Sequence, residues 1–542
     1  MKTVFVAVNA RYSHSSLAIR YIEKYNIKFN PELMEFSIND SIGSIYSALV
    51  ESGADVYCFS CYIWNIEIIL KAAELIKKAM PNIVIIFGGP ESGYNSDELL
   101  KKYNFIDTII RGEGEIIIGK VLELIQQGKR PNRFYQGECM DLNSLKFPYT
   151  TLDIENLKNK ILYFETSRGC PFRCAYCLSS ADSNGIRYFP MEYVKKGFKF
   201  FFDKKVPLVK LIDRTFNCDS KRAVEIVNYI IENSTATKVH FEIEASILTD
   251  ELISVLNSAP KDMFQIEVGV QTINHEALTA VNRNYDLEKI RYNIRRLTEP
   301  KNIHIHLDLI AGLPFEDYNS FIKSFNFVYS MSPDMLQLGF LKVLKGTQVS
   351  ERFTSDIKYA EFPPYEVIST KWISASELLK LKKVENAVDM FYNSGKFFNS
   401  IRSISEKPPY DNNPYSLFEQ LGEKVKSSEK AGKLANTAFY EILYEIFGDC
   451  IIEELAVDFI KNNKTARLPK FLHREMSKSF KTHCIELINN PNFVESYKIS
   501  GNLKDLRFEH ILNKVFVMDY SNNLFFDITE WSVSYTHLTL PT

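Results

Sequence analysis

The sequence lacks long apolar runs, net charge and abundant cysteine, and each shortage excludes something. No stretch approaches the roughly 20 apolar residues that a membrane-spanning helix needs, so no membrane partner is expected. A net charge of −2 over 542 residues gives no whole-protein electrostatic footprint for nucleic acid. Nine cysteines, an odd number, without a charged-then-apolar leader favour a reducing, cytoplasmic setting over a secreted, disulfide-bonded one.

The end of the sequence is set apart from the rest. Val533–Thr542 is similar along its whole length to one translated frame of a transposon-end adaptor used in sequencing libraries. We therefore expect residues 532–542 to be an artefact and exclude them from the analysis of the fold. Resequencing through this end settles the point.

Three of the nine cysteines lie close together, Cys170, Cys174 and Cys177, in the spacing C-x3-C-x2-C. Three thiolates on one short loop can hold three irons of a [4Fe-4S] cluster and leave the fourth iron open to a ligand. A structural zinc site would need a fourth ligand, and Cys139 and Cys218 have no partner at finger-like spacing. Buried, unligated thiols are the other alternative.

Residues 1–130 alternate apolar, strand-like runs with helical patterns. The strands are expected at Thr3–Val8, Leu33–Phe36, Val56–Ser60, Ile83–Phe87 and Ile106–Ile110. This alternation predicts an open parallel sheet of the flavodoxin or Rossmann type, which binds ligands at the carboxyl ends of its strands. Glycines mark two such ends, in Gly88-Gly89-Pro-Glu and in Arg-Gly112-Glu113-Gly-Glu. Ordinary tight turns would explain these glycines equally well.

A linker is expected over 131–158, and the strand–helix rhythm resumes over 159–354. Strands are predicted at Leu162–Thr166, Leu208–Asp213, Val239–Glu244, Phe264–Val270, Ile303–Ile310 and Met335–Phe340. Six such units fit an incomplete (βα)6 version of the TIM barrel, with its site at the carboxyl ends of the strands. Residue alternation favours the barrel lumen for Glu242 and Glu244. For His304 and His306 we expect hydrogen-bonded interior positions, with a ligand role as the alternative.

Residues 355–531 lack this rhythm and predict a mostly helical C-terminal region. Helices are expected at Ile368–Phe391, Tyr415–Lys426, Thr437–Phe447 and Ile451–Ile460. A basic run follows, which a solvated helix face would explain, with an anionic substrate or RNA as the alternative. Its residues are Lys461, Lys464, Arg467, Lys470, Arg474, Lys478 and Lys481. Cys450 and Cys484 show no ligand spacing.

The cysteine loop, Ser167-Arg-Gly-Cys-Pro-Phe-Arg-Cys-Ala-Tyr-Cys-Leu178, resembles the cluster motif of the radical S-adenosylmethionine (SAM) superfamily. The resemblance implies that the cofactor binds the open iron and is cleaved to a 5′-deoxyadenosyl radical. The segment at Asp213 resembles the one that contacts the amino group of SAM, the Glu267 strand the one that contacts the ribose, and the Gly312 turn the one that contacts the adenine. SAM contacts are thereby expected from Tyr176, Asp213, Glu244, Glu267, Gln271 and Gly312.

Residues 1–130 resemble the cobalamin-binding domain that precedes many radical SAM cores. The resemblance rests on the segments Asn-Ala-Arg-Tyr-Ser-His14, Ser-Cys-Tyr-Ile-Trp64-Asn and the two glycine turns. It implies cobalamin contacts from Asn9, Ser60, Trp64, Gly88, Gly89, Gly112 and Glu113. The D-x-H-x-x-G motif, whose histidine ligates cobalt from below, is absent, so we expect cobalamin to bind without a histidine lower ligand. Residues 355–531 are similar to an uncharacterised region found on some proteins of this kind.

These resemblances imply a cobalamin-dependent radical SAM enzyme that methylates a weakly activated carbon. Its cofactors would be a [4Fe-4S] cluster, SAM and cobalamin, and its partners a small-molecule or other unknown substrate and a low-potential electron donor of the flavodoxin or ferredoxin type. Radical cyclisation or rearrangement without methyl transfer is one alternative. A cobalamin and Fe-S redox sensor is the other.

Overall fold

The computed structural model describes residues 1–180, 185–234, 236–429, 437–472, 482, 486–499, 502–511 and 514–531. The expected artefact at 532–542, Cys484, and Arg474, Lys478 and Lys481 of the basic run lie outside these residues. The chain divides into two compact units, Met1–Leu378 and Leu379–Thr542. Within the described part of the chain, no helix is both long and apolar enough to span a bilayer.

The first unit opens with a parallel sheet whose strand order is β2-β1-β3-β4-β5-β6. Its strands are β1 (Thr3–Asn9), β2 (Glu32–Ser37), β3 (Val56–Ser60), β4 (Val84–Gly88), β5 (Thr108–Arg111) and β6 (Phe134–Gln136). The five predicted strands are confirmed to within two residues at either end. The sixth, β6, lies in the expected linker, because three residues at a sheet edge are too short to show an alternating pattern.

Helices cover both faces of this sheet. They are α1 (Leu17–Tyr25), α2 (Ile42–Ser52), α3 (Ile66–Ala79), α4 (Pro90–Gly93), α5 (Ser96–Lys102) and α6 (Glu115–Gln126). Apolar residues of α2, α3 and α5 pack with one set of alternating strand residues, and those of α1 and α6 with the other. In this strand order the chain reverses direction between β1 and β3, where flavodoxin-like folds bind their ligands.

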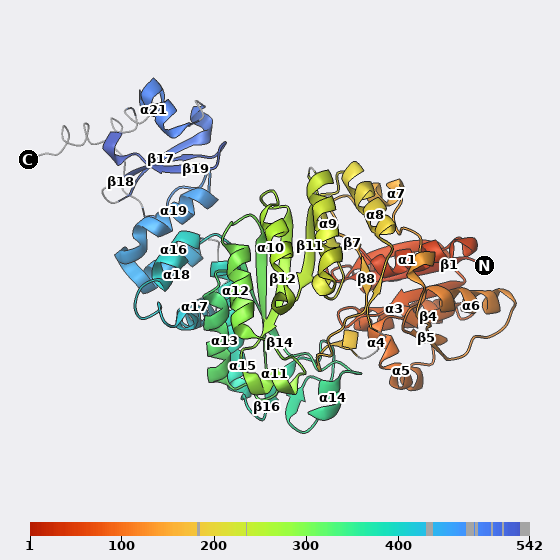
Figure 1. Ribbon diagram of the computed structural model, residues 1–542. Coiled ribbons are helices and arrows are strands. Elements are labelled where there is room, and N and C mark those ends of the chain that lie inside the picture. Colours follow the sequence, from red (N-terminus) through yellow and green to blue (C-terminus); the bar gives the residue numbers. More distant parts are fainter. Residues whose placement is uncertain are drawn as a thin grey trace, which may run out of the picture. The chain divides into compact units, whose positions relative to one another are not determined.

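The second sheet has the strand order β14-β13-β12-β11-β10-β7 and is also parallel. Its strands are β7 (Leu162–Phe164), β10 (Leu208–Leu211), β11 (Lys238–Ile243), β12 (Phe264–Gln271), β13 (His304–Ala311) and β14 (Met335–Phe340). Figure 1 shows helices α9 (Ser220–Asn233), α10 (Asp250–Asn257) and α12 (Leu287–Thr298) running beside the middle strands. The remaining helices of this part are α7 (Thr151–Asn156), α8 (Met191–Asp203), α11 (His275–Ala280), α13 (Tyr318–Tyr329) and α14 (Gln348–Arg352). The six-stranded, incomplete barrel is confirmed.

The two sheets are joined at the β7 edge. The loop after β1 forms a parallel bridge between His14 and Ile161, and the Ile161 amide donates to the Ser13 carbonyl oxygen at 2.7 Å. The hydroxyl of Ser15 donates to the Ile161 carbonyl at 2.8 Å. The carboxyl end of β1 thus lies against the beginning of the first barrel strand.

The C-terminal part is mostly helical, as expected, but its first residues differ from the prediction. The hairpin of β15 (Ile357–Tyr359) and β16 (Val367–Thr370) replaces the start of the helix predicted from Ile368. Helix α15 (Ala375–Ala387) begins after Ser374, because Ser374 and Glu377 cap it reciprocally, and a π-helical turn follows at Val388–Asn393. The sequence contains this Ser-x-x-Glu pattern, but the apolar periodicity before it led us to predict an earlier start of the helix.

The second unit contains α16 (Phe398–Ser405), α17 (Pro414–Glu429), α18 (Ala438–Phe447), α19 (Ile452–Asn462) and α21 (Pro491–Tyr497). It also contains an antiparallel sheet that we did not predict, formed by β17 (Leu506–Ile511), β18 (Lys514–Asp519) and β19 (Leu524–Asp527). Figure 1 shows α21 beside this sheet. The helix face expected for the basic run is wrong for Lys464, Arg467 and Lys470, because the described residues after α19 are not helical up to Leu472.

Candidate functional site

The cysteine loop follows the short strand β8 (Ser167–Arg168), directly after β7 at the carboxyl end of the barrel sheet. The backbone of Ala175 anchors it, with its amide donating to the Val281 carbonyl and its carbonyl accepting from the Val349 amide, both at 2.9 Å. Cys174 is buried, whereas Cys170 and Cys177 are half-buried. The loop is therefore fixed at its centre and presents two thiols toward the surface of the barrel end.

The three thiols suit a multi-iron cluster better than a single ion. In the described part of the chain, one group of side chains brings three ligand atoms close enough together to bind a single ion. That group does not contain these cysteines. A [4Fe-4S] cluster places each thiolate on a different iron, so the sulfur atoms need not converge on one point. Burial raises the pKa of the Cys174 thiol, and the nearby Arg283 charge offsets part of this rise. The neighbouring Cys177 and Cys170 also raise it.

Arg283 ties the loop to the barrel, and the sequence analysis missed it. Its guanidinium donates to the Tyr176 hydroxyl at 2.7 Å, the Cys174 Sγ at 3.8 Å, the Gly269 carbonyl at 2.8 Å and the Glu244 carboxylate at 3.0 Å. Tyr176 and Glu244, both expected to contact SAM, are thus held by one cation. The sequence does not link Arg283 to Cys174, Tyr176 and Glu244, because these residues lie on other strand–helix units.

Asp213 supports the strand that leads into the loop. It is 1% exposed, and its carboxylate accepts hydrogen bonds from the Thr166 amide, the Thr166 hydroxyl and the Ser167 hydroxyl, at 2.6 to 2.8 Å. Burial raises its pKa, and these donors counteract the rise. The expected contact with the SAM amino group stays a prediction, while the observed bonds show a role in placing the cysteine loop.

The remaining barrel-end residues offer polar atoms to a ligand. Gln271 ends β12 with a φ of 69°, and its Oε1 is buried without a hydrogen-bond partner in the described structure. A non-glycine residue in this conformation is strained, and such strain is common at binding sites. Gly312 has a φ of 85°, and a Cβ there would lie 2.8 Å from Val367 Cγ1. The Gln271 oxygen, which has no partner in the described structure, is the observation that fits binding of SAM at the barrel end.

The residues expected to contact cobalamin lie at or just after the carboxyl ends of four strands of the first sheet, β1, β3, β4 and β5. Trp64, which follows β3, is 43% exposed, stacks on Tyr62 with centroids 4.4 Å apart, and donates to the Val8 carbonyl at 3.2 Å. Ser60 and Asn9 end β3 and β1 at the β1/β3 switch point, where Asn9 donates to Glu35 at 2.8 Å. An exposed tryptophan held in place by stacking on a half-buried tyrosine fits a planar ligand such as a corrin.

The turn after β4 approaches the β3 loop very closely. Gly88 accepts a hydrogen bond from the Cys61 amide at 2.7 Å. Gly89 has a φ of 97°, and a Cβ there would lie 2.5 Å from the Cys61 carbonyl oxygen. Packing of the two turns alone therefore explains Gly89, and contacts of both glycines with cobalamin stay predictions.

The turn after β5 contacts the cysteine loop. Gly112 has a φ of 86°, which lets the turn bring Glu113 and Glu115 toward the barrel. Arg168 donates to Glu113 at 3.1 Å, to Glu115 at 2.8 Å and to Glu165 at 2.7 Å. Glu113 also accepts from the Met140 amide at 2.8 Å and pairs with Arg187. Its carboxylate thus joins the two sheets, and its expected cobalamin contact stays a prediction.

His14 is engaged within the protein. Its Nδ1 lies 3.1 Å from the Tyr163 hydroxyl, and its carbonyl accepts from Asn9 Nδ2 at 3.2 Å. Burial, followed by the charges of Arg11 and Lys210, lowers its pKa. This placement gives His14 a structural partner, and cobalamin binding without a histidine ligand stays a prediction.

A polar group lines the lumen below the strand ends. Glu267 lies 3.1 Å from His240 Nε2 and 3.2 Å from Lys210 Nζ. Burial by itself raises the pKa of Glu267. The His240 hydrogen bond and the Lys210 charge outweigh burial and lower this pKa to about 2. Burial and the nearby Glu267 carboxylate raise the pKa of Asp308 well above its usual value. Burial and then the neighbouring His304 lower the pKa of His306 to about 4.

Family models match three successive parts of the chain. Residues 3–122 match the B12 binding domain, residues 164–328 the radical SAM superfamily, and residues 354–535 a family described as a protein of unknown function, DUF4080. Both glycine turns fall in the first match and all three clustered cysteines in the second.

Two curated relatives are actinobacterial methyltransferases. The 2-(S-pantetheinyl)-carbapenam-3-carboxylate methyltransferase of Streptantibioticus cattleyicolor is 25% identical over 300 residues, 49% of this chain and 44% of its own length. The cobalamin-dependent radical SAM methyltransferase TokK of Streptomyces tokunonensis is 24% identical over 302 residues, again 49% and 44%. The chain thus spans less than half the length of these relatives.

Solved structures share the fold at low identity. The cobalamin-dependent S-adenosylmethionine radical enzyme OxsB, with aqua-cobalamin and SAM bound, has a TM-score of 0.61 and 13% identity over 87% of this chain and 82% of its own. The radical SAM methyltransferase TsrM from Kitasatospora setae has a TM-score of 0.56 and 12% identity over 67% and 80%. The chain thus contains, in this order, segments that match the B12 binding domain, the radical SAM superfamily and DUF4080, and it shares its fold with these solved structures.

Proposed function

We propose that the chain is a cobalamin-dependent radical SAM methyltransferase that acts on a weakly activated carbon. The observation that carries this proposal is the set of ion pairs from Arg168 to Glu113 and Glu115, which fastens the cysteine loop to a strand end of the B12-binding domain. Two cofactor sites fixed this close to one another suit a reaction in which both act on one substrate. The curated methyltransferases support the same activity.

The chain's own residues would bind and orient the cofactors. Cys170, Cys174 and Cys177 would hold the [4Fe-4S] cluster, and Tyr176, Glu244, Gln271 and Gly312 would surround SAM, with Asp213 and Glu267 as further expected contacts. Asn9, Ser60, Trp64, Gly88, Gly89, Gly112 and Glu113 would face or support cobalamin. When bound, these groups supply radical formation and a transferable methyl group.

The proposed limits of the parts follow the sequence analysis. Residues 1–130 would form the cobalamin-binding domain, 131–158 the linker, 159–354 the radical SAM core and 355–531 the C-terminal domain. A small-molecule substrate and an external low-potential reductant of the flavodoxin or ferredoxin type would complete the reaction. Free thiols and a reducible cluster would suit a reducing compartment such as the cytoplasm.

Anaerobic turnover of the reconstituted protein with SAM, cobalamin and a strong reductant tests the proposal. Formation of both S-adenosylhomocysteine and 5′-deoxyadenosine supports methyl transfer, whereas 5′-deoxyadenosine alone supports cyclisation or rearrangement. Cys174→Ala should abolish cluster absorbance and SAM cleavage, while Cys450→Ala, at an exposed cysteine of the second unit, should change neither. Wild-type protein that holds a full cluster and cleaves no SAM would favour the sensor and contradict the proposal.

A further inference from the structure

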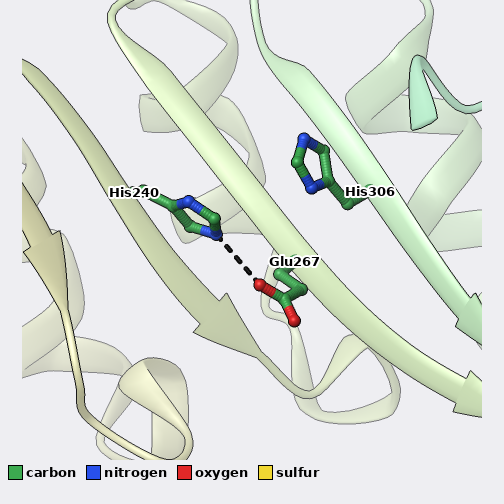
Figure 2. Close-up of side chains that lie close together, drawn as sticks. All are labelled: His240, Glu267 and His306. Atoms are coloured by element: carbon green, nitrogen blue, oxygen red, sulfur yellow. Dashed lines mark hydrogen bonds and ion pairs between the residues drawn. The ribbon is translucent and has the colours of Figure 1, made fainter. Parts of the chain in front are cut away.

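Three side chains in the barrel lumen form a group of which the proposed function uses only Glu267, as an expected SAM contact. His240, Glu267 and His306 lie on the adjacent strands β11, β12 and β13, and one ligand atom from each lies within 4.8 Å of the other two. Figure 2 shows the two imidazole rings on either side of the Glu267 carboxylate. Among the described residues, this is the group of histidine, cysteine and carboxylate side chains whose ligand atoms lie close enough together to bind one ion.

His240 and His306 are not among the expected cofactor contacts, and Glu267, which is one of them, lies deeper in its strand than the other expected SAM contacts on the barrel strands. His240 and His306 are the third residues of their strands, and Glu267 is the fourth of eight in β12. Glu244, Gln271 and Gly312 instead lie at or beyond the carboxyl ends. The three-residue group therefore occupies a deeper level of the lumen than the barrel end.

The distances suit a small ion. Two ligands bound at about 2.0–2.1 Å to one tetrahedral ion are roughly 3.3 Å apart. His240 Nε2 and Glu267 Oε2 are already 3.1 Å apart. The third ligand needs a shift of only about 1–1.5 Å, which a change of side-chain rotamer supplies.

Two buried atoms at this level are available to a ligand. His306 Nε2 is buried and has no hydrogen-bond partner in the described structure, and neither has Asp308 Oδ1, two residues further along the same face of β13. A buried nitrogen or oxygen without a partner costs roughly 1–3 kcal/mol. A hydrogen-bonded interior, as expected for His306, would have satisfied this nitrogen, whereas a metal ion would coordinate it.

We propose that His240, Glu267 and His306 bind one divalent transition-metal ion, such as Zn²⁺, separately from the cluster and cobalamin. Two imidazoles and one carboxylate are a ligand set that transition metals favour, and three protein ligands leave a position open for an outside donor. If the proposed function holds, a substrate oxygen or nitrogen in the lumen would occupy that position. Lys210, paired with Glu267, opposes the ion by its charge and holds the carboxylate before the ion binds.

The test uses the full-length protein with its cluster reconstituted, Zn²⁺ as the probe, and X-ray absorption at the zinc edge. The site predicts one Zn²⁺ with nitrogen and oxygen neighbours at about 2.0–2.1 Å, whereas capture by cysteines gives sulfur at about 2.3 Å. A sulfur-only shell, or no bound Zn²⁺, would overturn the proposal. This readout needs no turnover, so it fails or succeeds independently of methyl transfer.

Variants then locate the ion. His306→Gln and Glu267→Gln should each weaken Zn²⁺ binding about tenfold or more, because loss of an outer partner alone costs about that much at metal sites. His304→Gln is the matched control, since His304 lies on the same strand outside the ligand set, with Nδ1 4.0 Å from Asp334. Lys210→Met should tighten binding. Equal affinity in wild type and in both ligand variants would overturn the assignment.

Discussion

At the scale of single residues, Glu316 shows what burial does to a carboxyl group away from the cysteine loop. It is 1% exposed, accepts hydrogen bonds from Thr272 at 2.5 Å and Ser324 at 3.2 Å, and leaves Oε2 without a partner in the described structure. Burial raises its pKa to about 8 against a usual value of 4.5. The native state therefore binds a proton more tightly than the unfolded state does.

This difference predicts a pH-dependent stability. Below about pH 4.5 both states are protonated and the group adds no pH dependence; between about 4.5 and 8 the unfolded state alone loses its proton, so native stability falls as pH rises. Each tenfold difference in proton affinity is worth about 1.4 kcal/mol. Glu316→Gln should thus gain stability relative to wild type from pH 5 to pH 8, measured by anaerobic urea unfolding.

The neighbouring carboxylate provides the control for this prediction. Asp317 caps α13 by accepting from the Ser320 amide at 2.7 Å, and asparagine caps a helix equally well. Asp317→Asn should change the pH profile much less than Glu316→Gln does, because the Asp317 charge is the smallest of the contributions that raise the pKa of Glu316. A constant offset between wild type and Glu316→Gln across the range would contradict the assigned pKa.

Residue-scale prediction from the sequence succeeded where the chemistry is written in consecutive positions. The spacing of Cys170, Cys174 and Cys177 identified a loop that the structure places at the carboxyl end of a barrel strand. The contacts of Arg283 with Glu244 and of Arg168 with Glu113 and Glu115 could not be found in this way, because these partners are distant in the sequence. The hydrogen-bonding expectation for His306 fails for its Nε2, since alternation shows which face a residue occupies but not its partners.

At the scale of elements, periodicity predicted the long parallel strands well and the short antiparallel ones poorly. Strands flanked by helices bury both faces and form continuous apolar runs, as Val56–Ser60 does. Strands β17 to β19 have mixed burial and 4–6 residues each, so their pattern does not separate from that of loops. Strand β6, with three residues, was missed for the same reason.

The hairpin that begins the cysteine loop allows a test at this scale. Strand β8 pairs with β9 (Arg187–Tyr188), and Gly169 follows β8 with a φ of 97°. A Cβ on Gly169 would lie 2.1 Å from the Gly185 carbonyl oxygen, so the two strands would have to separate. Gly169→Ala should therefore lose most of its iron and sulfide after anaerobic reconstitution.

Gly185, two residues before β9, provides a matched control. Its φ is 76°, but a Cβ there meets no heavy atom of the described residues within 4 Å. Gly185→Ala thus suffers only the backbone strain of roughly 1–2 kcal/mol that both variants share. It should retain its cluster, and equal iron loss in the two variants would show that strain alone, rather than the close approach, controls cluster binding.

At the scale of the whole molecule, the first unit depends on an arginine shared by two sheets. Arg168, on β8 just after the barrel strand β7, pairs with Glu113 and Glu115 of the segment that matches the B12 binding domain, and with Glu165. Burial raises the pKa of Glu165 to about 7 even beside this cation. The two sheets are thus coupled through charges that have little access to water, and removal of the cation leaves three carboxylates facing one another.

Arg168→Met should therefore destabilise the first unit by about 3–5 kcal/mol, because breaking a buried ion pair leaves an uncompensated charge. Anaerobic urea unfolding of the full chain, followed by tryptophan fluorescence and by cobalamin absorbance, measures it. Lys120→Met is the control, since Lys120 pairs with Glu138 at 2.9 Å with both side chains exposed, and such pairs contribute about 0–1 kcal/mol. We also expect the Arg168 variant to release cobalamin at lower urea than it loses its tryptophan signal, because the coupling of the sheets fails first. A single transition at the wild-type midpoint would show that the two sheets do not rely on this arginine.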